Sequence, residues 1–201
     1  MRTRIITTAL SIILVAAFQS RAQDLSSKLG EARSSYNSGS LDDARFALEQ
    51  ALQQIDQAVG REILKILPTD LMGMNFIEGE DNVVGTNLGF AGLFVDRNYG
   101  QGEKNAGIDI IGDSPLMAGL NAMLALPAIM TQGDQDQKRI KVDGYKSLLQ
   151  KESGSEGITS YSVQIPANHT LITLNVQGYS ESEVISMANM IPVSQIVKLA
   201  R

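Results

Sequence analysis

The longest stretch of helical periodicity in this chain lies between residues 41 and 67. Apolar residues recur there at steps of three and four, at Leu41, Ala44, Leu48, Ala51, Leu52, Ile55, Ala58, Val59, Ile63, Ile66 and Leu67. This spacing predicts one apolar stripe along a long helix. Asp42 and Asp43 fall in the first turn, where the helix dipole favours negative charge, and Pro68 follows the last turn.

A shorter helix is predicted just before the long one. Leu29, Ala32 and Tyr36 mark one of its faces, and Asn-Ser-Gly-Ser at 37–40 supplies the turn between the two helices. Residues 29–59 resemble a single tetratricopeptide repeat, with small residues at Ala32, Gly39, Ala44 and Ala51 and a large apolar residue at Leu48. The resemblance implies a closely packed helical hairpin, and repeats of this kind commonly bind other proteins.

Short strands are predicted after the hairpin, because glycine recurs between Pro68 and Gly112 and divides the sequence into brief apolar pieces. Two of these pieces, "FAGLFVDRNY" and "AGIDIIGD", indicate strands joined by a turn at "GQGEKN". Asp113, Ser114 and Pro115 are typical of a helix start. The apolar stripe behind them predicts a methionine-lined helix over residues 114–130.

The sequence pattern of the last part of the chain predicts strands followed by a helix. Three strand candidates follow in order, "RIKVDGYKSLLQ", "ITSYSVQIP" and "TLITLNVQGY". Ser180 and Glu183 have the spacing of a capping box, which predicts a helix behind them. The expected fold class is therefore α+β: an N-terminal helical hairpin followed by an antiparallel sheet packed with two helices on one face. This order of elements is similar to that of the PsbP/Mog1-like group of small α+β proteins.

The first 22 residues are expected to be a secretory signal peptide. Arg2 and Arg4 precede an apolar run, and Ser20 and Ala22 are the small residues of a cleavage site, so the exported chain should begin at Gln23. An uncleaved N-terminal anchor is the alternative. The remaining expected domains are a hairpin over residues 23–67 and a glycine-rich α+β domain over residues 68–201.

The amino-acid composition disfavours several classes of binding partner and several kinds of metal site. Removal of the signal peptide leaves 14 basic residues against 22 acidic ones and a net charge of −8, which disfavours nucleic acid and anionic lipid as partners. The chain has no cysteine, which excludes disulfides and a cysteine-linked lipid anchor. With His169 as the single histidine, a zinc site is not expected, and no cofactor or metal is expected. Oxygen ligands for calcium could come from Asp134 and Asp136, or from Glu78, Glu80 and Asp81, but neither set matches a calcium loop.

We therefore interpret the sequence as an exported, periplasmic or secreted non-enzymatic protein that acts through contacts with an unknown protein of the cell envelope. The expected contact residues lie on the polar side of the long helix, at Asp42, Asp43, Arg45, Glu49, Gln50 and Gln53. The alternatives are a periplasmic carrier of a small apolar ligand beside Met117, Leu120 and Leu124, and a hydrolase using His169.

Overall fold

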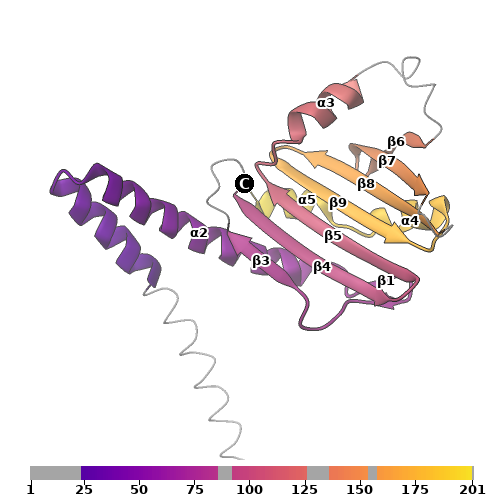
Figure 1. Cartoon of the computed structure of the whole chain (residues 1–201), viewed down its shortest axis with the longest axis horizontal. Helices are drawn as coiled ribbons and strands as arrows, with labels where there is room; N and C mark the ends of the chain where they lie inside the picture. The colour runs from indigo at the N-terminus through magenta and orange to yellow at the C-terminus, as the bar shows by residue number, and fades with distance from the viewer. Residues whose placement is uncertain (1–23, 86–91, 126–135, 154–157, 201) are drawn as a thin grey trace, which may run out of the picture. The chain divides into compact units, whose positions relative to one another are not determined.

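The computed structural model describes residues 24–85, 92–125, 136–153 and 158–200 (Figure 1). The expected signal peptide lies outside these residues. The chain divides into two compact units between Ile55 and Asp56, inside the long helix, so residues 56–66 belong with the sheet domain. The expected α+β class, with a helical hairpin before an antiparallel sheet, is confirmed.

The first unit contains two helical segments. Residues 24–37 are helical, and α2 (Leu41–Ile66) begins after a short turn. Gly39 lies in this turn with a φ of +84°, a conformation that costs glycine little because it has no Cβ. The Gln54 side chain donates a hydrogen bond to the Asp24 carboxylate at 2.9 Å, which ties the two ends of the hairpin together.

The second unit is built on a seven-stranded sheet in the order β3-β4-β5-β9-β8-β7-β6, and every neighbouring pair is antiparallel. Its strands are β3 (Asn82–Gly85), β4 (Leu93–Gln101), β5 (Lys104–Gly112), β6 (Gln137–Val142), β7 (Tyr145–Ser153), β8 (Thr159–Ala167) and β9 (Thr170–Gln177). A separate two-stranded ladder pairs β1 (Asp70–Leu71) with β2 (Met74–Asn75).

One sequence prediction was wrong at "RIKVDGYKSLLQ". This segment is not a single strand but a hairpin, in which β6 turns into β7 at Asp143 and Gly144. Both turn residues have positive φ, +48° and +84°, as in the tight turns that Asp-Gly favours between antiparallel strands. The Asp143 carboxylate also accepts the backbone N–H of Ser194 at 2.7 Å, next to the start of α5 (Val193–Leu199).

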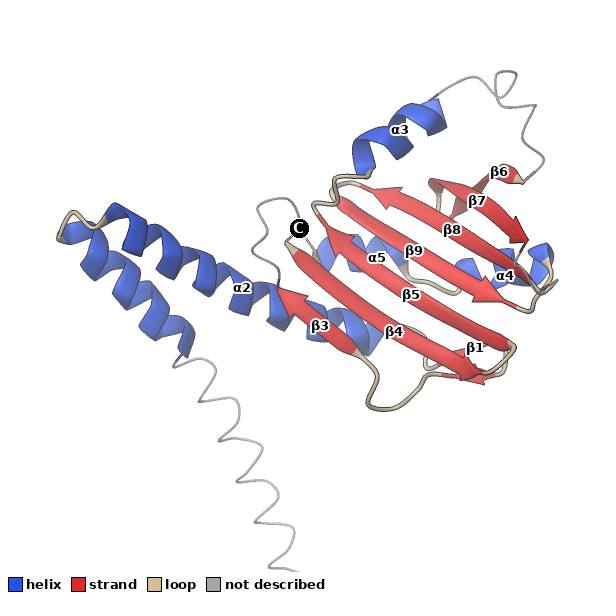
Figure 2. Cartoon of the chain, viewed as in Figure 1, coloured by secondary structure: helices blue, strands red, loops and turns tan. Residues whose placement is uncertain are grey.

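The main core lies on one face of the sheet, where α4 (Glu181–Ala188), α5 and the second half of α2 cover it; α4 and α5 are visible behind the strands in Figure 2. The core includes Ile63 of α2, Tyr99 of β4, Ile108 of β5, Leu174 of β9 and Met187 of α4. Alternate residues of β4, β5 and β9 point to the opposite face because side chains alternate along a strand. The Ser180–Glu183 capping box before α4 is confirmed, with the Ser180 N–H bound to the Glu183 carboxylate at 2.8 Å.

A further helix, α3 (Met117–Ala125), lies on the other face of the sheet. Its Leu120 and Leu124 pack against Leu148 of β7 and Leu171 of β9. The expectation of helices on one face only was therefore wrong. The reason lies in the strands: Leu148 and Leu149 are consecutive and both buried, so β7 is covered on both faces at this point.

Candidate functional site

Alanines hold the N-terminal hairpin together. Ala32 of the first helix and Ala44, Ala47 and Ala51 of α2 are buried, and Ala47 is completely inaccessible to solvent. At 100° per residue the three α2 alanines lie within about 60° of one another, on the side of α2 that faces the first helix. The small side chains allow a close approach of the two helices, as the expected hairpin required at Ala32, Ala44 and Ala51.

The large apolar residues of the hairpin lie outside this contact. We call them the leucine face: Leu29 and Tyr36 of the first helix, and Leu41, Leu48, Leu52 and Ile55 of α2, each between 44% and 68% exposed. The α2 members follow one another at seven, four and three residues and share a stripe about 60° wide. On each helix, the exposed apolar residues are displaced around the helix axis from the buried alanines in the same rotational direction. Because the two helices are antiparallel, this displacement places the exposed apolar residues of both helices on one side of the hairpin.

None of the expected contact residues lies on the leucine face. At 100° per residue, Arg45 and Glu49 border the stripe, whereas Asp43 and Gln50 lie on the opposite side of α2. Asp42, Asp43 and Arg45 are exposed, and the Arg45 Nε lies 3.0 Å from Glu49 Oε1. Glu49, Gln50 and Gln53 are half-buried, and the Gln50 Oε1 atom is buried with no hydrogen-bond partner in the described structure. The apolar periodicity of α2 could not separate these exposed leucines from the buried alanines, because the same periodicity also describes a buried stripe.

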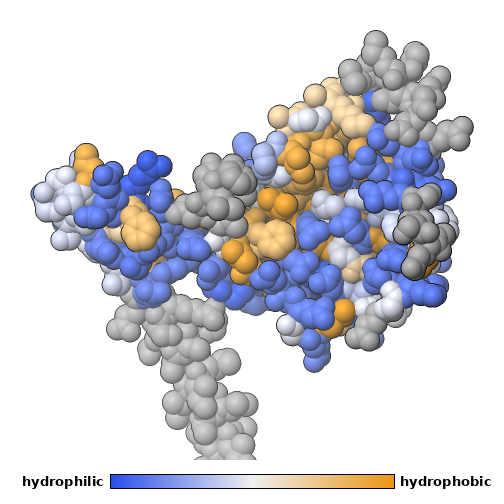
Figure 3. All heavy atoms as spheres, viewed as in Figure 1, coloured by the Kyte–Doolittle hydropathy of each residue, from blue (hydrophilic) through white to orange (hydrophobic). Residues whose placement is uncertain are grey.

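A second surface lies on the open face of the sheet. We call it the polar basin, a depression with a volume of about 600 Å³ that spans β4, β5, β9, β8 and β7. Its polar lining residues are Glu80, Asp96, Asn98, Asn105, Asp109, Glu152, Ser160, Ser162, Asn175 and Gln177. Figure 3 shows this face, with hydrophilic side chains over the ends of β4 and β9 and hydrophobic ones between α3 and the start of β4.

Two carboxylates meet in the polar basin. Asp96 and Asp109 are direct cross-strand partners, and a hydrogen bond links their side chains. Burial and the neighbouring charge of Asp96 raise the pKa of Asp109 to about 6, and burial also raises the pKa of Asp96. The Asn175 side-chain amide donates to Asp109 Oδ2 at 3.1 Å, and Asn98 donates to Asp96 Oδ1 at 3.3 Å. Near neutral pH this pair therefore exchanges a proton more readily than an isolated aspartate.

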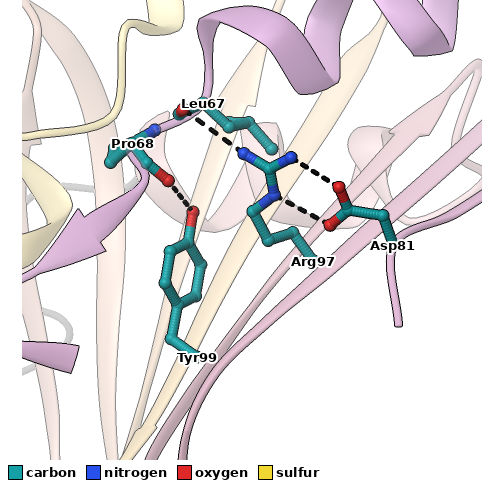
Figure 4. Close-up of polar contacts among 5 residues, drawn as sticks. All are labelled: Leu67, Pro68, Asp81, Arg97 and Tyr99. Carbon is teal, nitrogen blue, oxygen red and sulfur yellow. Dashed lines mark hydrogen bonds and ion pairs between the residues drawn. The ribbon is translucent and has the colours of Figure 1, made fainter. Parts of the chain in front are cut away.

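A polar network on the helix-covered face has a structural role. Arg97, buried in the row between Val95 and Tyr99, pairs with Asp81 and donates to the Leu67 carbonyl, while the Tyr99 hydroxyl donates to the Pro68 carbonyl at 2.8 Å (Figure 4). Burial raises the pKa of Tyr99 to about 12. These bonds satisfy carbonyls just after the end of α2 and attach that segment to β4.

His169 does not lie in an assembled catalytic group. Its side chain is 88% exposed, and its Nδ1 lies 3.8 Å from the carboxylate of Asp113, which is also exposed. The depression at this end of the sheet is lined by Asn168, His169, Thr170, Val197 and Ala200, none of which is a serine. The only hydroxyl side chain among these lining residues is that of Thr170, which is buried.

The apolar side of α3 is packed rather than open at the residues considered for a carrier. Leu120 and Leu124 are buried against Leu148 and Leu171, with Met117 and Met123 beside them. The expected helix over residues 114–130 begins only at Met117, because residues 114–116 are not helical, and residues 126–130 lie outside the described residues.

Metal ligands do not gather in the described part of the chain. Within residues 24–85, 92–125, 136–153 and 158–200, no three histidine, aspartate or glutamate side chains are placed to share an ion. Asp134, one of the candidate calcium ligands, is outside these ranges. Among the described helices, none is long and apolar enough to span a membrane.

Comparison with known proteins assigns no family. No family model matches the chain, and no curated protein matches it either. Among solved structures, it is similar to the extracellular domain of PknH from Mycobacterium tuberculosis, with 13% identity over 56% of this chain and 68% of that one. The TM-score of 0.36 is too low for this likeness to support the resemblances noted in the sequence or any function.

Proposed function

We propose that this protein is exported and acts without catalysis, by binding an amphipathic helix of another envelope protein on the leucine face. The single observation that carries the proposal is the exposure of Leu41, Leu48, Leu52 and Ile55 along one stripe of α2. Soluble proteins rarely expose contiguous apolar side chains to water, and where such side chains cluster they mark interaction sites. The proposal of export is supported by the charged, apolar and small-residue order of the first 22 residues.

The spacing of the leucine face specifies the kind of occupant. Steps of seven, four and three residues are those of a helix that contacts another helix along a seam. The buried alanines already hold the hairpin together, so these leucines remain available for a helix from outside. A partner helix would meet them with its own apolar residues at similar spacing.

Acidic charge on the first turns of α2 favours a basic partner. Asp42, Asp43 and Glu49 outnumber Arg45 on the first turns of α2, and Arg45 is already paired with Glu49. Lysines or arginines flanking the partner's apolar stripe would complement these acidic residues. Of the expected residues Asp42, Asp43, Arg45, Glu49, Gln50 and Gln53, Arg45 and Glu49 lie nearest the leucine stripe and act at the border of the interface, and the leucines form its centre.

Site-specific photocrosslinking in the native host tests this proposal. A photoreactive amino acid at position 48 or 52 should give an adduct that maps to an apolar helix flanked by lysine or arginine. A Leu48→Asp substitution should abolish the adduct formed from position 52. Phe46→Asp is the matched control, because Phe46 is also exposed but lies about 150° from the leucine stripe.

The other outcomes overturn the proposal. Adducts only to a second copy would make the leucine face a self-association surface. Equal adducts from position 46 would indicate non-specific contact, and no adduct from positions 48 and 52 would leave the leucine face without a partner.

A further inference from the structure

The open face of the sheet arranges polar side chains in cross-strand rows. One row runs Asp96–Asp109–Thr173–Gln164, the next Asn98–Gly107–Asn175–Ser162, and the third Gly100–Asn105–Gln177–Ser160. The rows contain no large apolar side chain. The centre of the opposite face is apolar apart from Arg97, with Lys104 and Thr170 at the strand ends, so the polar rows are not needed to build the core.

The floor of the polar basin is left low at its centre. Gly107 lies between Asn98 and Asn175 in the middle row, and a Cβ added there would stand 3.2 Å from Asn98 Oδ1. The two neighbouring amides and the nearby Asp109 carboxylate therefore border a space that any larger residue at position 107 would fill. The volume of about 600 Å³ is in the range of small-molecule sites.

The charged side chains that line the polar basin are all negative. Four carboxylates line it, from Glu80, Asp96, Asp109 and Glu152, and no lysine, arginine or histidine is among the described residues that do. Adjacent carboxylates on neighbouring strands repel each other, which destabilises the folded sheet. A surface that contacts only water would avoid this repulsion with asparagine in place of Asp109. A low-dielectric floor lined by one sign of charge concentrates ligands of the opposite sign.

The distance between these carboxylates suits an extended organic cation better than a single metal ion. Asp96 is on β4 and Glu152 on β7, four strand spacings of about 4.8 Å apart in the sheet order β4-β5-β9-β8-β7. A single metal ion cannot contact both ends, and the described residues place no three acidic ligands together. A flexible chain with several ammonium groups can reach both ends, and each ammonium donates up to three hydrogen bonds to carboxylate, amide or hydroxyl oxygens.

We propose that the polar basin binds a linear polyamine across β4, β5, β9, β8 and β7. Asp96 and Asp109 hold one ammonium group, and Asn98, Asn175 and Gln177 accept hydrogen bonds from the others. Glu152 of β7 lies near the other end of the bound polyamine. This site is independent of the leucine face, so either proposal can fail without the other.

Binding should strengthen as the pH rises through the range in which Asp109 ionises. The charged group that faces Asp109 is Asp96 on β4, while β9 contributes the neutral Asn175; Glu80 and Asp81 act on Asp96 from the segment before β3. With the pKa of Asp109 at about 6, the pair carries less negative charge at pH 5 than at pH 7.5. A cationic ligand therefore loses attraction at the lower pH.

Isothermal titration of the full-length protein with spermidine tests the proposal. Saturable one-site binding is expected at pH 7.5 and low salt, with weaker binding at pH 5. Asp109→Asn and Asp96→Asn should each weaken it by about tenfold, the loss expected for a charge-assisted hydrogen bond. Asp43→Asn, which removes the same charge from the exposed start of α2, should leave the affinity unchanged.

A second variant covers the floor of the polar basin. Gly107→Val, checked for folding by circular dichroism, should block spermidine while leaving all four carboxylates in place. The proposal is overturned if spermidine gives no saturable heat, if magnesium chloride competes at equal concentration, or if the Asp96, Asp109 and Gly107 variants bind as well as the unaltered protein.

Discussion

The guanidinium of Arg97 and the carboxylate of Asp81 form a two-bond ion pair, with Nε 2.8 Å from Oδ1 and Nη2 2.5 Å from Oδ2. Arg97 also lies over the ring of Phe76 at 4.6 Å and is almost completely buried. A buried guanidinium needs such a partner, because an unpaired charge in the interior carries a large desolvation cost.

Asp81→Asn should therefore destabilise the sheet domain by about 3 kcal/mol, toward the lower end of the cost of breaking a buried pair, since Asp81 retains some exposure. Chemical denaturation followed by circular dichroism measures this loss. Lys65→Ala removes the exposed Lys65–Glu62 pair and should cost less than about 1 kcal/mol. Equal effects of the two substitutions would contradict a structural role for the Arg97 pair.

The alanine contact of the hairpin has no room for a larger side chain. Ala47→Leu should destabilise the hairpin by about 1–3 kcal/mol, because the added methyl groups must push the two helices apart. Hydrogen exchange of residues 24–55 would detect the loss as faster exchange. Ser34→Leu, at an exposed position of the first helix, is the size-matched control and should leave exchange unchanged.

The Asp96–Asp109 pair predicts a specific dependence of stability on pH. Because the folded protein raises the pKa of Asp109 to about 6, its contribution to stability is full below the unfolded value of 3.8 and is lost as the pH rises through about 6. Asp109→Asn should remove that pH dependence and increase stability at pH 7.5 relative to the unaltered protein. Urea denaturation at pH 4 and pH 7.5 separates the two cases, and a variant that is less stable at pH 7.5 would refute the argument.

Export is expected to remove the first 22 residues. N-terminal sequencing of the protein recovered from outside the cytoplasm should begin at Gln23, since Ser20 and Ala22 have the small side chains that a signal peptidase site requires. Recovery of the chain with Met1 intact in the membrane fraction would instead support an uncleaved anchor.

His169 is not expected to be needed for function. The His169→Ala variant should keep the cellular role of the protein, because the imidazole is exposed and no serine lines the depression beside it. Complementation of a deletion strain measures this outcome. Loss of complementation by a stably folded variant would restore the hydrolase hypothesis.

Several features were fixed by local sequence patterns alone. The period-two alternation of β8 and β9 and the Ser180–Glu183 spacing before α4 each depend on residues close together in the sequence, so they could be predicted. The Asp143-Gly144 turn had an equally local signal, and the β6–β7 hairpin could have been found from it.

The two candidate sites were decided by the tertiary structure. Periodicity places Leu41 and Ala44 on one broad side of α2, but only the position of the first helix determines that the alanine is buried and the leucine exposed. In the same way, alternation puts Asp96 and Asp109 on the surface of their strands, whereas the register of β4 against β5 makes them neighbours. Strand register and helix contact join residues that are distant in sequence, and no local pattern encodes them.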